Sequence, residues 1–142
     1  MRKTFINGLL VSLGLSLAGT GAAFGAGEGA RFGLELNKLE PVSGACRVYF
    51  VLRNASGEAV ESYKPDLVFF DKQGVVANRL VVEGGPIPSG KTRVKLFDVK
   101  GLDCDAVGSV LLNDLTGCQT PTGGSCLQVT ETTSRASVDF VK

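Results

Sequence analysis

Beyond residue 30, apolar and polar residues alternate with a period of two in several short stretches of the chain. Residues 32–36 carry an apolar side chain at every second position, and residues 46–53 do so from Cys46 onward. Successive side chains of a β-strand point to opposite faces, so this pattern predicts strands with one buried face. No stretch after residue 30 sustains the period of an amphipathic helix, so we expect at most one helical turn, near residues 101–107.

Turn-forming residues separate these strands from further ones. The apolar run at 67–70 ends in a turn that closes with Gly74, where a positive φ is often needed. A loop rich in glycine and proline at 84–90 cannot sustain a ladder and marks another break. The remaining predicted strands are residues 75–82, 92–99, 107–115, 127–130 and 137–141. About seven or eight short antiparallel strands with frequent turns predict an all-β sandwich of the immunoglobulin or fibronectin type.

The strand at 92–99 contributes to a predicted surface. By its alternation it is expected to turn Val94 and Leu96 into the sandwich. Its basic residues then point outward and, in immunoglobulin-like strand order, lie beside the outward arginines of the strand at 46–53. The sequence therefore predicts a small basic face made of Arg47, Arg53, Arg93 and Lys95. Two interpretations of such a face are possible. It binds an anion or a partner, or it is only solvated and keeps the sheet from aggregating.

The N-terminal stretch has the pattern of a secretory signal peptide. A positive start is followed by an apolar run and then by small residues, which predicts a signal at residues 1–25 with cleavage after Gly25, or alternatively after Ala26. The apolar run is shorter than the roughly 20 residues that span a membrane, so an uncleaved anchor is the weaker alternative. We expect residues 26–142 to form a single β-sandwich domain that is periplasmic or secreted and not stably inserted in a membrane.

The charge of this predicted mature domain is close to neutral. The whole chain has 15 basic and 14 acidic residues, and the signal contains two of the basic ones and no acid. Residues 26–142 therefore carry a formal net charge of −1. This balance argues against general attraction to nucleic acid or to anionic lipid.

Four cysteines follow the predicted signal: Cys46, Cys104, Cys118 and Cys126. An exported protein meets an oxidising compartment, so we expect two disulfides rather than reactive thiols. Of the three possible connectivities we favour Cys46–Cys104 and Cys118–Cys126, because the second closes a short loop that otherwise has little to order it. A zinc site made of all four is disfavoured, since the gap between the last two is unlike the tight spacing of zinc ligands.

The chain contains no histidine, which limits its possible chemistry. Ser-His-Asp and Cys-His mechanisms are excluded, and the commonest transition-metal ligand is missing. Asp98, Asp103 and Asp105 offer oxygen atoms near Cys104, but they lack the spacing of a calcium loop, so a solvated turn is the preferred interpretation. We expect neither a cofactor nor a metal, and no catalytic residue is assigned. A hydrolase that uses carboxylates alone remains an alternative.

Three turns resemble those of a known class of domain. Residues 54–57 read Asn-Ala-Ser-Gly, residues 70–74 read Phe-Asp-Lys-Gln-Gly, and residues 87–90 read Ile-Pro-Ser-Gly before the strand at 92–99. In this respect the stretch 48–99 is similar to FxLYD-type extracytoplasmic β-sandwich domains of bacteria, with Phe70 where that family usually has tyrosine. The whole chain also looks similar to uncharacterised exported proteins of proteobacteria. The resemblance implies a sandwich and no activity.

These observations together predict a non-enzymatic binding or envelope-accessory module. Its partner is expected to be another envelope protein, met through an edge strand or an exposed loop. A periplasmic protein that binds a small ligand or a metal between its sheets is the second alternative, beside the hydrolase.

Overall fold

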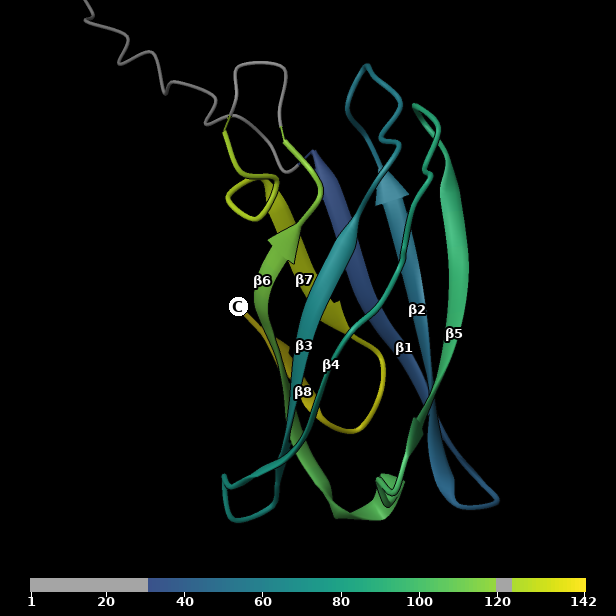
Figure 1. Ribbon diagram of the computed structural model, residues 1–142, viewed down its shortest axis with the longest axis vertical. Helices are drawn as coiled ribbons and strands as arrows, with labels where there is room; N and C mark the ends of the chain where they lie inside the picture. The colour runs from purple at the N-terminus through teal and green to yellow at the C-terminus, as the bar shows by residue number, and fades with distance from the viewer. Residues whose placement is uncertain (1–30, 120–123) are drawn as a thin grey trace, which may run out of the picture.

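The computed structural model describes residues 31–119 and 124–142. The predicted signal peptide at 1–25 lies outside the described residues, as does the segment 120–123 of the loop between Cys118 and Cys126. The described part is almost entirely β-structure arranged in two layers (Figure 1). The elements are β1 (Phe32–Val42), β2 (Ala45–Asn54), β3 (Lys64–Asp71), β4 (Val76–Val81), β5 (Thr92–Lys100), the 3₁₀ turn η1 (Cys104–Ala106), β6 (Val107–Thr116), β7 (Thr130–Ser134) and β8 (Asp139–Val141).

The strands form two four-stranded sheets, in the orders β5-β2-β1-β7 and β4-β3-β6-β8. This confirms the predicted all-β sandwich, and the helical turn expected near residues 101–107 is present as η1. The strands are not antiparallel throughout, however, because β7 runs parallel to β1 and β8 runs parallel to β6. Neither of these pairs is joined by a hairpin. Each partner returns after a long crossover, which permits the parallel direction.

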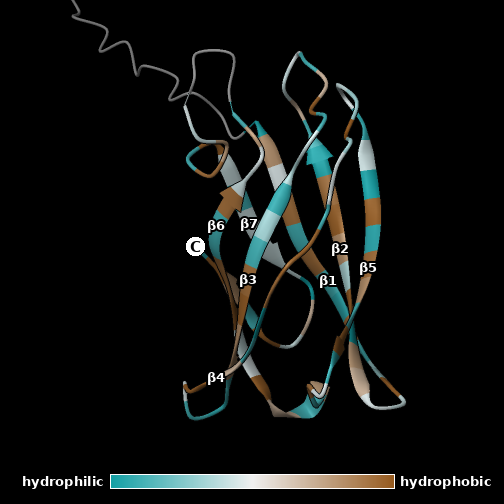
Figure 2. Ribbon diagram, in the orientation of Figure 1, coloured by the Kyte–Doolittle hydropathy of each residue, from teal (hydrophilic) through white to brown (hydrophobic). Residues whose placement is uncertain are grey.

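The core lies between the two sheets and is built from the alternation seen in the sequence. Phe32, Leu34 and Leu36 of β1 are buried, and so are the four apolar residues of β2 that start at Cys46. Gly74 has a φ of 79° and closes the turn between β3 and β4, as its position in the sequence suggests. In the hydropathy colouring the body of β2 is largely hydrophobic and its arrowhead is hydrophilic (Figure 2).

The C-terminal strands differ from the prediction. Residues 127–130 were expected to form a strand, but residues 126–129 form a turn in which the Val129 amide donates to the Cys126 carbonyl. Strand β7 begins only at Thr130 and has the sequence Thr-Glu-Thr-Thr-Ser. Its single buried side chain is Thr130, so it has no apolar alternation by which a sequence pattern could identify it.

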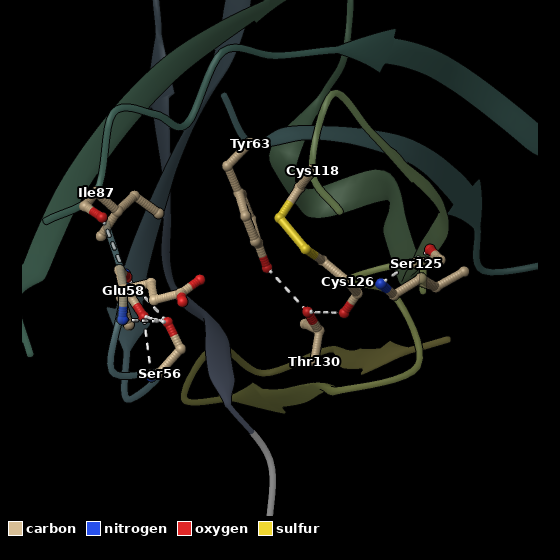
Figure 3. The surroundings of a disulfide bond; sticks show 10 residues. Ser56, Glu58, Tyr63, Ile87, Cys118, Ser125, Cys126 and Thr130 are labelled. Carbon is tan, nitrogen blue, oxygen red and sulfur yellow. Dashed lines mark hydrogen bonds between the residues drawn. A yellow bond between two sulfur atoms is a disulfide. The ribbon is translucent and has the colours of Figure 1, made fainter. Parts of the chain in front are cut away.

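Both favoured disulfides are present, Cys46–Cys104 and Cys118–Cys126. The first ties β2 to η1, and both of its cysteines are buried. Beside the second, the Tyr63 hydroxyl lies 3.2 Å from the Thr130 hydroxyl, which donates to the Cys126 carbonyl (Figure 3). Burial raises the pKa of Tyr63 to about 12, so this phenol stays neutral and joins the start of β7 to the disulfide loop.

A buried asparagine fixes the loops at the far end of β2. The Asn54 side chain is fully buried and donates to the carbonyls of Glu58 and Ile87, at 2.8 and 2.9 Å. Its carbonyl oxygen accepts from the amide and the hydroxyl of Ser56. Ile87 also pairs with Val60 through two backbone hydrogen bonds, so the loop that leads into β5 is held against the rest of the molecule.

Candidate functional site

Among residues 31–119 and 124–142, strand β5 lies at the end of its sheet and pairs with a strand on one side only, β2. It has nine residues and pairs with β2 without a register shift, whereas the pairing of β4, an edge strand of the other sheet, is interrupted by a bulge. The other two edge strands, β7 and β8, have five and three residues. A long and regular edge is the kind of site to which an extended chain can add.

Hydrogen bonding along this edge follows from the ladder with β2. The Asn54 amide donates to the Lys91 carbonyl at one end, and the Gly101 amide donates to the Gly44 carbonyl at the other. Bonded pairs alternate in an antiparallel ladder, so the residues between these ends bond to β2 at every second position. The backbone N–H and C=O groups that point away from β2 therefore belong to Thr92, Val94, Leu96, Asp98 and Lys100. The Lys100 carbonyl accepts a hydrogen bond from the Asn78 side chain of β4.

The side chains of β5 point to the faces opposite to those predicted, so the prediction that Val94 and Leu96 turn into the sandwich is wrong. Val94 and Leu96 are 58% and 48% exposed and lie on the outer face of the sheet, where they pair with Val51 and Tyr49 of β2. The inner row contains Lys95, followed by the half-buried Phe97 and the buried Val99. Both rows of this strand are partly apolar, and pairing of Val99 with the disulfide-bonded Cys46 decides which row faces inward.

The predicted basic face is therefore divided between two sides of the sheet. Arg47 and Arg53 are on the outer face, whereas Arg93 and Lys95 pair with the inward residues of β2 and lie on the inner side, at the open edge. Arg47 is also neutralised, because its guanidinium donates two hydrogen bonds to the Asp98 carboxylate at 2.7 and 2.9 Å. These bonds raise the pKa of Arg47 and lower that of Asp98.

Lys91 extends the inner row and was not recognised from the sequence. It precedes β5 and continues the ladder through its carbonyl, so Lys91, Arg93 and Lys95 follow one another on the same side. None of the three makes an ion pair with another residue in 31–119 or 124–142. The sequence has basic residues at every second position of 91–95, and this spacing could have predicted that Lys91 lies on the same side as the other two.

The carboxylates with shifted pKa values are paired with cations or amides. A hydrogen bond from Asn37 lowers the pKa of Glu35, and bonds from Lys38 and the Tyr49 hydroxyl lower that of Glu40. In all four carboxyls whose pKa is shifted, Glu35, Glu40, Asp66 and Asp98, the shift is downward. A raised pKa in a pocket is what a carboxylate-only hydrolase would need for its general acid.

Asp66 is the most buried of these carboxylates. Its side chain is 5% exposed, and it accepts two hydrogen bonds from Arg79 and one from Asn113. The bonds from Arg79, supported by Asn113, lower the pKa of Asp66 against the opposing effect of burial. The group therefore contributes stability above the ordinary carboxyl pKa of about 3.9, and this contribution is lost as the pH falls through the lower folded value.

We therefore expect Asp66→Asn to be less stable than the wild type at pH 7 and to lose less further stability on acidification from about pH 5 to pH 2. Urea unfolding midpoints at three pH values measure both effects. Asp139→Asn is the control, since Asp139 is exposed on β8 of the same sheet. Equal acid sensitivity of Asp66→Asn and the wild type would contradict the assignment.

Two hollows of the surface lie beside Cys104. One of about 320 Å³ is lined by residues that include Pro41, Gly44 and Asp103, and another of about 410 Å³ includes Lys72 and Ser137. Of the three aspartates near Cys104, Asp103 caps η1 by accepting from the Asp105 amide, and Asp98 is bound by Arg47. No group of three or more acidic or cysteine side chains in the described ranges is arranged to hold a metal ion.

Comparisons with known proteins give a likeness of fold. No family model matches the chain, and no curated protein matches it. Among solved structures, IrmA from Escherichia coli is similar with a TM-score of 0.58 and 15% sequence identity, covering 71% of this chain and 89% of that one. No helix in the described residues is long and apolar enough to cross a membrane. The FxLYD resemblance stays a prediction, and the similarity to IrmA supports the β-sandwich fold.

Proposed function

We propose that this chain is an exported, non-catalytic binding protein that accepts an extended segment of a partner polypeptide along the free edge of β5. The partner is expected to be another envelope protein. The observation that carries the proposal is the nine-residue edge itself, whose outward N–H and C=O groups include those of Thr92, Val94, Leu96 and Asp98. An added strand would satisfy these groups as a neighbouring strand of the sheet does.

The surroundings of β5 support this role. The two disulfides are those expected of a protein in an oxidising compartment, and one of them anchors β2, the strand on which β5 lies. The loop that leads into β5 is fixed by Asn54 through Ile87. The edge is therefore presented on a rigid support, which reduces the entropy that would be lost on binding.

Proline substitution at the edge tests the proposal. Val94→Pro removes an outward N–H while leaving the ladder to β2 intact, since proline is tolerated at edge positions whose N–H faces solvent. Val81→Pro is the matched control on the edge of β4, because the neighbouring Val82 amide is the one that bonds to β3. Leu96→Pro repeats the test at a second outward position. Circular dichroism and urea unfolding establish that each variant is folded.

Peptides are selected from a displayed random library against the mature domain and then measured on each variant. We expect binding to be lost with Val94→Pro and Leu96→Pro and retained with Val81→Pro. Enrichment of no peptide, or equal binding by folded variants of both edges, would overturn the proposal.

A further inference from the structure

Resting on the proposed role of the β5 edge, we infer that the segment it accepts alternates acidic with apolar residues. The two faces of an added strand would meet different surroundings, because side chains that are opposite each other in a sheet lie on the same face. The inner row of β5 presents positive charge at its start, and the outer row presents aliphatic side chains.

The inner row determines the acidic positions. Lys91, Arg93 and Lys95 follow one another on this row without a carboxylate partner in the described residues. The acid nearest in sequence, Asp98, is on the opposite face and is bound by Arg47. The predicted mature domain has a net charge of −1, so this row is a local excess of positive charge and not a property of the whole surface. Carboxylates on the incoming strand complement it, and basic residues are repelled.

The outer row determines the apolar positions. Val94 and Leu96 are the exposed members of an apolar strip that continues onto β2 through Val51. An aliphatic side chain opposite either residue would cover it and extend the strip by one strand. Alternation is required because the acidic and the apolar requirements fall on opposite faces of the same added strand.

A second copy of this chain fits the edge less well. Pairing two β5 strands would bring two rows of unpaired cations onto the same side of one continuous sheet, where like charges are unfavourable. The free cations therefore favour an acidic partner over self-association.

The experiment uses two short synthetic peptides, one alternating Glu with Val and one alternating Lys with Val. Each is N-methylated along one edge so that it cannot pair with itself. The proteins are the mature domain and the Arg93→Glu/Lys95→Glu variant, and fluorescence anisotropy measures binding. The wild type is expected to prefer the Glu peptide by about tenfold, and the variant to prefer the Lys peptide by a similar factor. Arg53→Glu, on the outer face, is the control and should leave the preference unchanged.

Equal binding of the two peptides by the wild type, or an unchanged preference in the charge-reversed variant, would overturn the inference. If the β5 edge is still the binding site in that case, Val94→Pro would still abolish binding of the library-selected peptides. The proposed binding edge and the inferred acidic pattern of its partner can therefore fail separately. A wild-type domain that is dimeric in sedimentation and binds neither peptide would assign the edge to a second copy and would also overturn the inference.

Discussion

Replacing Cys46 and Cys104 together with alanine is expected to lower the free energy of unfolding by about 4 kcal/mol, the largest effect of any change considered for this protein. The two cysteines are 58 residues apart in sequence, and their bond restricts a long loop of the unfolded chain. Both are buried, so the substitution also removes packing atoms from the core. For a domain of this size such a loss is a large share of the total stability.

Urea unfolding of the oxidised double variant measures this change. Cys118→Ala/Cys126→Ala is the matched control, because that disulfide joins residues only eight apart and is expected to contribute about 2.6 kcal/mol in the same chain-entropy treatment. A smaller loss for the long loop than for the short one would show that constraint of the unfolded chain is not what stabilises the molecule.

Asn54→Ala is expected to cost about 3 kcal/mol, since it removes four hydrogen bonds at a fully buried side chain. The carbonyl of Ile87 would lose a donor in a buried position, and the Ser56 amide would lose its acceptor. Thermal unfolding and hydrogen exchange measure the result. We expect faster exchange in the loop 84–90 and at the start of β5, because Ile87 is held by this side chain.

Asn54→Asp separates the loss of hydrogen bonds from the loss of volume. It keeps the shape and the acceptor but places a carboxylate against the carbonyls of Glu58 and Ile87. Its folded pKa should be raised, so the variant should gain stability as the pH falls through that value, when the acid can donate one bond. A stability that does not change with pH relative to wild type would contradict this account of the site.

β1 and β2 could be predicted from the sequence because one face of each carries a regular row of apolar residues. β3 could be predicted because its short apolar run ends in a turn. β7 could not, since its stability comes from pairing with β1 and from the buried hydroxyl of Thr130. Asn54 has the sequence context of an ordinary turn residue. Only the fold brings Ile87, which is distant in sequence, within reach of its amide.

The sequence predicted some of the basic residues of the candidate site but not the face of the sheet on which they lie. The sequence identified Arg93 and Lys95 as a pair on one side of β5, and it identified Arg47 as exposed. It could not show on which side the pair lies, because both rows of β5 contain two apolar residues. The ion pair of Arg47 with Asp98 depends on the register between two strands, which no single stretch of sequence contains.

The parallel strands β7 and β8 also bear on how the molecule folds. Each sheet receives a strand from residues 130–141, and β7 pairs with β1 almost a hundred positions earlier in the chain. Such non-local pairing gives a high contact order and slow folding. The sheet of β1, β2 and β5 and the Cys46–Cys104 bond require only residues 32–104, so we expect oxidation to precede closure of the sandwich. In this order the disulfide stabilises a partly folded intermediate before β7 and β8 pair with their sheets.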